Sequence, residues 1–541
     1  MIKNPILPGF NPDPSICRVG DDYYIATSTF EWYPGVQIHH SKDLANWTLV
    51  KRPLERQCQL DMRGNPDSCG VWAPCLSYAD GLFWLVYTDV KRLDGNFKDA
   101  HNYIVTAPDI AGPWSDPIYA NSSGFDPSLF HDDDGRKWFV NVLWNHRSDS
   151  VGGSPKHLAF AGILLQEYDH NAGKLIGDIT NISSGSPHGL IEAPHLFKRN
   201  GYYYLTVAEG GTGYQHTVTM LRSRNLAGPY ELHPNMFLMT SKDDPAAALQ
   251  RAGHGQIVET PDGLIYHTHL CSRPLETNEN VTARRSPLGR ETGLQKCVWK
   301  EDDWLYLENG GLVPELEVAP PDGKAETDAL QPVCRRFDST ELPLEFQWLR
   351  SPFPERLFSC TGQGLVLHAR ESIGSWFEQS LVGRRQEHHS FRAETAVEFA
   401  PLTIQQSAGL AHYYNRGKFH LMGVAWHETH GRILTILSCP GDWPDGRLEF
   451  PLQEVVQLPE RGTVQLAMEV NREQLQFFYR LSDEVDWQPV GPVLDASVIS
   501  DEGGRGEHAS FTGAFVAMAA FDTSGSALDA RYSHFNYLPR D

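Results

Sequence analysis

Gly201-Tyr-Tyr-Tyr-Leu-Thr-Val-Ala, at residues 201–208, is a turn glycine that leads into a strand rich in aromatic side chains. The same pattern begins at Gly20, Gly81, Gly135 and Gly263. The five glycines stand about sixty residues apart, and turn residues precede them, as a β-hairpin requires. A unit of this length holds several strands, so the first 300 residues or so predict a five-bladed β-propeller. A sandwich with accidental internal similarity is the alternative.

The pattern changes near residue 315. Val318-Ala-Pro-Pro-Asp-Gly-Lys is typical of a polar linker. Beyond it, alternating strands such as 391–399 and 464–470 lack the sixty-residue period. We therefore expect an all-β chain, with a propeller over residues 1–317, a linker over 318–332 and a lectin-like β-sandwich (a jelly roll) over 333–541.

One residue in each repeat occupies the same place relative to the turn glycine. Nine residues before the glycine stand Trp72, Asp126, Glu192 and His254, and in the first repeat, where the turn is shorter, Asp13 stands seven before it. Equivalent positions on the innermost strands of a propeller all face its axis. We therefore expect these five side chains to converge on one pocket.

Three carboxylates in one pocket indicate a functional site. Burying them together is costly unless something uses them, and their repulsion raises the proton affinity of at least one. Glycoside hydrolysis needs one carboxyl to protonate the leaving oxygen and another to activate water or attack the sugar. Metal binding is the competing use, although a single His disfavours a catalytic zinc site. A lectin-like propeller, the non-enzymatic alternative, has no need of three axial acids.

The composition narrows the partners and the compartment. The formal net charge of −22 disfavours nucleic acid and anionic membranes as partners. The 14 Trp, 20 Tyr and 25 Phe suit sugar binding and equally suit an all-β protein. No stretch approaches about 18 apolar residues, which disfavours a membrane-spanning helix. The nine cysteines are scattered, without a CxxC pair, so we expect reduced thiols in a cytoplasmic protein.

Several motifs together resemble glycoside hydrolase family 43, in particular its two-domain β-xylosidases. They are Asn11-Pro-Asp13-Pro-Ser, Gly70-Val-Trp72-Ala-Pro, Gly124-Phe-Asp126-Pro-Ser, Glu192-Ala-Pro-His, Pro287-Leu-Gly-Arg290-Glu-Thr, Gln405-Gln-Ser-Ala-Gly-Leu, Tyr413-Tyr-Asn and Phe511-Thr-Gly-Ala-Phe. The resemblance covers nearly the whole chain. It implies an exo-acting hydrolase that releases D-xylose from the non-reducing end of β-1,4-xylo-oligosaccharides, with a side activity on α-L-arabinofuranosides.

The resemblance also implies a role for each axial acid. Asp13 matches the general base that activates the attacking water. Glu192 matches the general acid, and Asp126 matches the carboxylate that orients the acid and modulates its pKa. The implied mechanism is inverting, which would require the base and the acid to stand roughly 6.5–9.5 Å apart.

The sugar-binding groups are implied in the same way. Arg290 resembles the arginine that hydrogen-bonds the terminal sugar, and Phe30, Trp72 and Trp144 resemble the aromatic walls of two subsites. Core packing is the alternative for Phe30 and Trp144. Phe511 is the candidate for a sandwich loop that narrows the pocket mouth. A narrowed, blind pocket implies exo cleavage, whereas an endo-arabinanase needs an open groove.

His254 matches a histidine that in relatives lies below the site, near a calcium ion or a water. The chemistry itself requires no cofactor, and relatives are often homotetramers, so a homo-oligomer (tetramer or dimer) is expected. Three residues depart from the family pattern. Cys75 replaces a His, Asn145 replaces an Asp, and Val207 replaces a Thr. These departures bear on subsite detail and leaving-group preference.

Overall fold

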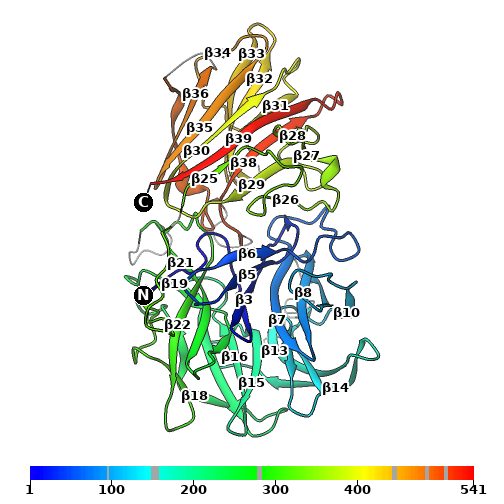
Figure 1. The fold of residues 1–541 in the computed structure, drawn as a ribbon, viewed down its shortest axis with the longest axis vertical. Coiled ribbons are helices and arrows are strands. Elements are labelled where there is room, and N and C mark those ends of the chain that lie inside the picture. Colours follow the sequence, from blue (N-terminus) through cyan, green and yellow to red (C-terminus); the bar gives the residue numbers. More distant parts are fainter. Residues whose placement is uncertain are drawn as a thin grey trace.

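Two β architectures are stacked in the structure, which is a computed structural model (Figure 1). It describes residues 1–93, 97–147, 158–276, 283–329, 331–441, 447–481, 486–504 and 510–540. The N-terminal part is a ring of five antiparallel sheets, and the C-terminal part is a sandwich of two larger sheets. The C-terminus lies beside the junction between them.

The five sheets of the ring are the blades predicted from the repeat. Blade 1 contains β2 (Ser15–Val19), β3 (Asp22–Thr27), β5 (Gln37–Ser41) and β6 (Thr48–Lys51), and blade 2 contains β7 (Gly70–Ala79), β8 (Leu82–Arg92), β9 (Asp99–Ala107) and β10 (Ile118–Asn121). Blade 3 contains β11 (Ser128–His131), β12 (Lys137–Trp144), β13 (Phe160–Asp169) and β14 (Lys174–Ser183), and blade 4 contains β15 (Glu192–Arg199), β16 (Tyr202–Glu209), β17 (Thr217–Ser223) and β18 (Glu231–Thr240). Blade 5 contains β19 (Gln250–Gly253), β20 (Ile257–Glu259), β21 (Ile265–Ser272), β22 (Glu291–Trp299) and β23 (Leu305–Leu307).

The turn glycines and the inner strands explain the ring. All five glycines of the repeat have φ between 62° and 84°, a range that glycine adopts without the strain of a Cβ atom. Each joins the inner strand of its blade to the next strand. The inner strands meet one another, since β2 contacts β7 and β20, and β11 contacts β7 and β15. The starts of these strands therefore surround one axis.

The ring closes where the first residues of the chain meet blade 5. β1 (Ile2–Lys3) pairs with β24 (Glu317–Val318), and Leu7 forms a bridge with Thr292 of β22. The Asn4 amide donates to the Leu294 carbonyl at 2.8 Å and accepts from the Leu294 N–H at 2.8 Å. β24 extends across the expected boundary after residue 317, and that boundary stays a prediction.

The C-terminal part consists of two eight-stranded sheets packed face to face. One sheet runs in the order β27 (Phe358–Cys360), β28 (Leu365–His368), β39 (Asp529–Pro539), β30 (Ser390–Glu398), β35 (Thr463–Asn471), β36 (Gln474–Leu481) and β37 (Gln488–Asp495), with β25 (Val333–Arg335) paired to β39. The other runs in the order β34 (Val456–Gln457), β33 (Gly431–Pro440), β32 (Lys418–His427), β31 (Gln406–Asn415), β38 (Phe515–Asp522), β29 (Ser380–Arg385), β26 (Gln347–Leu349) and β4 (Trp32–Tyr33). The described part also contains the 3-10 helices η2 (Pro354–Arg356) and η3 (Ala496–Val498).

The last strand of the second sheet, β4, comes from the propeller. Trp32 and Tyr33 of β4 pair with Leu349 and Trp348 of β26. The Trp32 ring also stacks on Phe515 of the sandwich, with 3.6 Å between the ring centroids. Buried apolar side chains of both parts form continuous clusters across this junction. The sandwich is therefore held against the ring by backbone pairing as well as by apolar burial.

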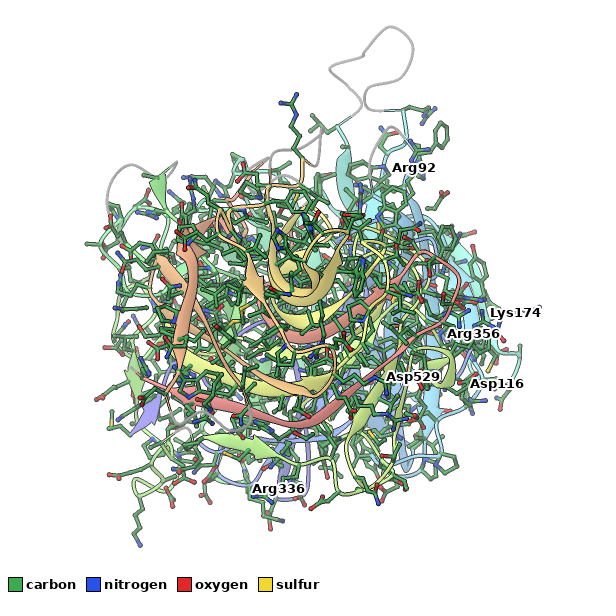
Figure 2. The ribbon with its side chains drawn as sticks, turned by 90° about the horizontal axis from the view of Figure 1, so that it is seen from above. Arg92, Asp116, Lys174, Arg336, Arg356 and Asp529 are labelled. Atoms are coloured by element: carbon green, nitrogen blue, oxygen red, sulfur yellow. The ribbon has the colours of Figure 1, made fainter. Side chains whose placement is uncertain are left out.

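The predicted all-β class, a five-bladed propeller followed by a lectin-like sandwich, is confirmed. Figure 2 shows the molecule from above the sandwich, with six charged residues labelled. The labelled examples Arg92, Asp116, Lys174, Arg336, Arg356 and Asp529 are all exposed. None of the helices in the described ranges has the length and apolar character needed to cross a bilayer.

Candidate active site

Local backbone irregularities place the axial residues at the starts of the inner strands. Asp13 and Asp126 stand two residues before β2 and β11, with φ of 57° and 53°. Asp tolerates this left-handed region better than most residues do. In β7 and β15 the pairing register shifts directly after Trp72 and Glu192. Such bulges turn a side chain out of the regular ladder, and they occur often beside active sites.

Asp13 is a buried carboxylate with a donor on each oxygen. The Ser28 hydroxyl donates to Asp13 Oδ2 at 2.6 Å, and Arg290 Nη1 donates to Asp13 Oδ1 at 3.1 Å. His254 Nδ1 lies 3.5 Å from the same Oδ1. Both oxygens of this buried carboxyl therefore have a hydrogen-bond donor, and one of the donors is a charged guanidinium.

Glu192 is a buried carboxyl in a contrasting environment. Within the described part of the chain its Oε1 has no hydrogen-bond partner, and His216 Nδ1 lies 4.0 Å away. Burial, reinforced by the negative charges of Asp126 and Asp13, raises the pKa of Glu192 well above its usual range. The raised pKa favours the protonated form of Glu192, which is the form a proton donor needs.

Asp126 links the two environments. Its Oδ2 accepts a hydrogen bond from the Ala193 N–H at 3.1 Å, so it holds the backbone directly after Glu192. Burial and the charge of Asp13 raise the pKa of Asp126 to about 8. Asp126 and Glu192 therefore interact strongly, and the loss of a proton from one affects the other.

Two buried histidines, His216 and His254, lie beside the acids. Burial is the main cause that lowers the pKa values of His195, His216, His254 and His267, each to about 3. Across the described ranges, no group of three His, Cys, Asp or Glu side chains is placed to hold a metal ion. Ca²⁺ needs about six to eight oxygen ligands, whereas His254 faces an Asp13 oxygen that Arg290 already occupies. These residues do not fit a directly bound calcium ion, and a water-mediated one stays a prediction.

Three aromatic rings and Arg290 form one wall of the site. Phe30 lies 6.0 Å from Trp72 and 6.2 Å from Phe511, measured between ring centroids. Trp72 and Phe511 meet edge to face at 5.9 Å. The Arg290 guanidinium carbon lies 5.3 Å from the Phe30 ring and 5.7 Å from the Phe511 ring. The structure thus brings the sandwich residue Phe511 to the propeller residues with which sequence analysis grouped it.

Trp144 belongs to a second aromatic group beside this wall. Phe125 connects the two groups, because its ring lies 5.5 Å from Trp72 and 6.0 Å from Trp144. Lys98 Nζ lies 4.4 Å from the centroid of Trp144 and 5.9 Å from that of Trp72. A cation over two indole faces, next to flat apolar surfaces, can bind the faces and hydroxyls of a second sugar.

The three departures from the family pattern have structural roles here. Cys75 is a buried thiol whose sulfur lies 3.9 Å from His195 Nδ1. Asn145 Oδ1 accepts from the Arg147 N–H at 3.0 Å in the turn after β12. Val207 is buried in an apolar cluster between blades.

Sequence analysis missed residues that complete the site. Ser28 donates to Asp13 and also accepts from the Ala73 N–H at 2.7 Å, so it ties blade 1 to blade 2. Lys98, His216 and Ser68 lie outside the repeated positions. The repeat therefore gave no signal for any of them, and only contacts in space identify them.

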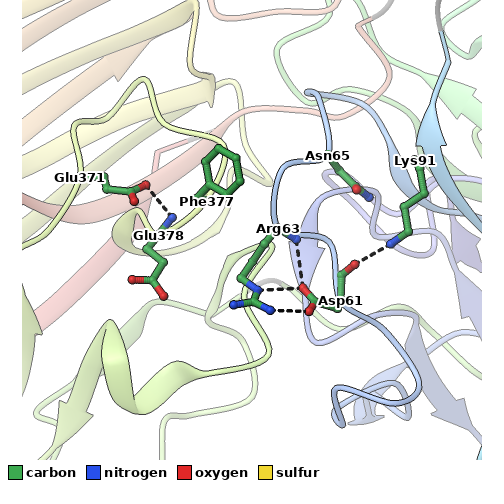
Figure 3. Close-up of a pocket in the computed structure, with 7 residues that line it drawn as sticks. All are labelled: Asp61, Arg63, Asn65, Lys91, Glu371, Phe377 and Glu378. Carbon is green, nitrogen blue, oxygen red and sulfur yellow. Dashed lines mark hydrogen bonds and ion pairs between the residues drawn. The ribbon is translucent and has the colours of Figure 1, made fainter.

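A separate pocket of about 620 Å³ lies where the ring meets the sandwich (Figure 3). It is lined by Asp61, Arg63, Asn65, Lys91, Glu371, Phe377 and Glu378, and by none of the axial residues. Its charged groups contact one another. Arg63 pairs with Asp61, and Lys91 donates to the Asp61 carbonyl. Nothing in this pocket offers the pair of contrasting carboxyls found at the axis.

Comparisons with known proteins agree with this arrangement. The family profile described as glycosyl hydrolases family 43 matches residues 2–305, and the profile of the beta xylosidase C-terminal Concanavalin A-like domain matches residues 334–538. The chain is 57% identical to xylosidase/arabinosidase 43B of Humicola insolens, over 99% of this chain and 98% of the relative. It is 48% identical to a beta-xylosidase of Bacillus subtilis (strain 168), over 99% of both chains.

A solved structure resembles the whole chain. The crystal structure of xylan beta-1,4-xylosidase from Bacillus halodurans C-125 superposes with a TM-score of 0.94 at 48% identity, covering 99% of this chain and 100% of the other. The similarity therefore extends over both domains and over their arrangement.

Proposed function

Since the chain belongs to glycosyl hydrolases family 43, we propose that it is an exo-acting β-xylosidase that releases D-xylose from the non-reducing end of β-1,4-xylo-oligosaccharides with inversion of configuration. One observation carries the proposal. Glu192, a buried carboxyl whose pKa is raised, shares the site with Asp13, a carboxyl held by hydrogen-bond donors on both oxygens. Acid–base hydrolysis of a glycoside requires two carboxyl groups in contrasting environments, one as the acid and one as the base.

In this proposal Asp13 is the general base. It takes a proton from the water that attacks the anomeric carbon of the terminal xylose. Ser28 and Arg290 hold its two oxygens, which fixes the direction from which the proton is accepted.

Glu192 is the general acid, which donates its proton to the glycosidic oxygen as the bond to the leaving sugar breaks. Its unpaired Oε1 is free to meet that oxygen. Asp126 orients Glu192 through the Ala193 N–H. Burial is the main cause that keeps the proton on the acid, and the charge that Asp126 carries once it ionises adds to it. The negative charge then left on Glu192 is stabilised by Arg290 and Lys98, both of which favour its ionised form.

The wall of Phe30, Trp72 and Phe511 binds the terminal xylose, and Arg290 hydrogen-bonds it. Trp144 and Lys98 receive the leaving sugar. Because Phe511 comes from the sandwich and packs on the propeller wall, the second domain narrows the mouth of the site in this proposal. A narrowed, blind pocket accepts a chain end rather than the middle of a polymer.

A second activity, on α-L-arabinofuranosides, is part of the proposal. It is supported by the relative from Humicola insolens, which is described as a xylosidase/arabinosidase. Xylopyranose and arabinofuranose can present similar hydroxyl positions to one pocket. Measuring kcat/KM on nitrophenyl xyloside and nitrophenyl arabinofuranoside tests which activity is the main one. A much higher value on the arabinofuranoside would make the xylosidase activity the secondary one.

The remaining expectations are part of the same proposal. We infer a cytoplasmic enzyme acting on imported xylo-oligosaccharides, which is supported by buried free thiols such as Cys271 and Cys297. We also infer a homo-oligomer. Exposed apolar side chains at one end of the sandwich, including Phe450 at 62% and Val493 at 57%, support self-association. Light scattering on the purified protein would test it.

Proton NMR during hydrolysis of xylobiose tests the central proposal. Early appearance of α-xylose from the intact protein is the expected result for inversion. Early β-xylose would refute inversion and keep the substrate, whereas absence of any turnover would refute the xylosidase assignment.

A further inference from the structure

Phe511 is held by the propeller through both of its backbone polar groups. Its N–H donates to the Ser68 hydroxyl at 3.1 Å, and its carbonyl accepts from Arg290 Nη2 at 3.0 Å. The residue is part of the sandwich, yet these two bonds reach blade 2 and the segment before β22. The position of the Phe511 ring therefore depends on two propeller side chains.

Ser68 contacts a second ring of the same wall. Its carbonyl accepts from the Trp72 indole N–H at 2.9 Å. The hydroxyl of Ser68 thus holds Phe511 while its carbonyl holds Trp72, and these two rings meet edge to face. One buried residue sets the relative placement of two aromatic groups proposed to bind the terminal sugar.

Ser68 is itself held rigidly. It is fully buried, and its N–H donates to Glu31 Oε2 at 3.0 Å, directly beside Phe30. The loop that carries it is clamped from the sandwich, because Arg350 donates to the Asn65 carbonyl and to Asp67, both at 2.7 Å. This loop continues from the Asp61–Asn65 segment drawn in Figure 3. Because burial and these hydrogen bonds fix the Ser68 backbone, Ser68 can in turn hold its neighbours in place.

The contacts form a continuous chain from Ser68 to the axial acid. Ser68 Oγ holds the Phe511 N–H, the Phe511 carbonyl holds Arg290 Nη2, and Arg290 Nη1 donates to Asp13 Oδ1. Loss of the bond between Ser68 and Phe511 would free the backbone of Phe511, whose carbonyl holds Arg290 Nη2 in place. The effect would reach the sugar-binding wall without any contact between Ser68 and the sugar.

We propose that Ser68 is a positioning residue for substrate binding, which acts by holding Phe511 and Trp72 together around Arg290. This proposal rests on the β-xylosidase function proposed above. It assigns to Ser68 a role that no motif of the sequence indicates.

The backbone conformation of Ser68 allows an experiment that separates a loss of positioning from a loss of stability. Its φ is +62°, where glycine is favoured over serine. Ser68→Gly removes the hydroxyl and relieves the strain, so the folded protein should be as stable as the wild type or more so. Ser68→Ala removes the hydroxyl and keeps the strain. If Ser68 positions the wall, both variants should raise KM for xylobiose about tenfold while kcat falls less than threefold.

Ser351 provides a matched control. It is fully buried, its carbonyl accepts from the Trp348 indole N–H at 2.8 Å, and its hydroxyl accepts from the Phe353 N–H at 3.2 Å. Ser351→Ala therefore removes the same kind of bond from the same kind of residue, away from the site. We expect its KM to stay within twofold of the wild type.

Kinetics on xylobiose and Tm for the wild type and the three variants separate the outcomes. Raised KM in both Ser68 variants, with Tm of Ser68→Gly maintained, would support the proposal. Wild-type KM in Ser68→Gly would refute it, as would an equal KM increase in Ser351→Ala. If the wild type does not hydrolyse xylobiose, the proposed function fails first. The inference about Ser68 is then tested by calorimetric binding of D-xylose to the same proteins, where weaker binding only in the Ser68 variants supports it and equal binding in all four refutes it.

Discussion

The axis of the propeller and the rim around Phe511 build one pocket by different routes. Asp13, Asp126 and Glu192 occupy the same place in the first, third and fourth repeats, so the symmetry of the ring brings them together. Phe511 comes from a domain with no such repeat, and individual hydrogen bonds to Ser68 and Arg290 place it. The acids proposed to react therefore stand at positions that the blades repeat. The ring that shapes access to them is held by hydrogen bonds that occur once in the molecule. Changes at the axis should abolish turnover, whereas changes at the rim should alter selectivity.

The largest effect is expected at the axis. Glu192→Ala removes the proton donor, and activity on xylobiose should fall by a factor on the order of 10²–10⁴. Nitrophenyl xyloside needs less protonation of its leaving group, so its hydrolysis should fall much less. Initial rates on both substrates measure the difference.

Glu231→Gln is the control for that variant. Glu231 lies on the outer strand of the same blade, where its exposed carboxylate pairs with Arg222. Its rates should stay within twofold of the wild type. Equal losses on the two substrates for Glu192→Ala would show that Glu192 is not the acid, and the contrast between axis and rim would lose its main support.

A smaller effect is expected at the rim. Phe511→Ala removes one ring of the wall and leaves the acids in place, so KM for xylobiose should rise about tenfold with little change in kcat. Phe377→Ala removes a 55% exposed ring of the sandwich beside the other pocket and should leave both constants unchanged. A loss of kcat on the scale of Glu192→Ala would place Phe511 with the reacting groups instead.

The pH dependence sharpens the description of the axis. The negative charge of Asp126 is one cause of the raised pKa of Glu192, so Asp126→Asn should lower the pKa of the acid. The alkaline limb of the kcat/KM profile should then move to lower pH by about one unit, together with a fall in rate. An alkaline limb that does not move would separate Asp126 from the titration of the acid.

The smallest effect concerns stability. The pKa of Asp126 is raised to about 8 from its ordinary 3.8, so the folded protein retains a proton that the unfolded chain releases. This group therefore contributes its full stability below about pH 4 and loses it as the pH rises towards 8. Asp126→Asn does not titrate, and its Tm should gain on the wild type by roughly 1–4 °C between pH 4.5 and pH 8. Calorimetry at the two pH values checks this gain, and a constant difference would contradict it.

The two routes also explain what the sequence could predict. The turn glycines recur about every sixty residues, so blade number and the five axial positions followed from their spacing. The partners of those positions did not follow, because Ser28, Ser68 and His216 are not among the residues that recur with the repeat. The Lys98 contact with Trp144 likewise depends on how loops meet in space. The pairing of β4 with β26 joins residues 32–33 to residues 348–349, and a two-residue strand carries no periodic signal.

That pairing has a consequence for the order in which the chain is made. When a ribosome has released the first blade, β4 has no partner, because β26 lies some three hundred residues further along. The nascent chain must keep Trp32 and Tyr33 available through the synthesis of the whole ring. A sandwich expressed alone would expose the unpaired edge of β26, which could then pair with a strand of another chain. Separating the chain between β24 and β26 would therefore leave an unpaired strand on each part, and both parts should aggregate more readily than the whole protein.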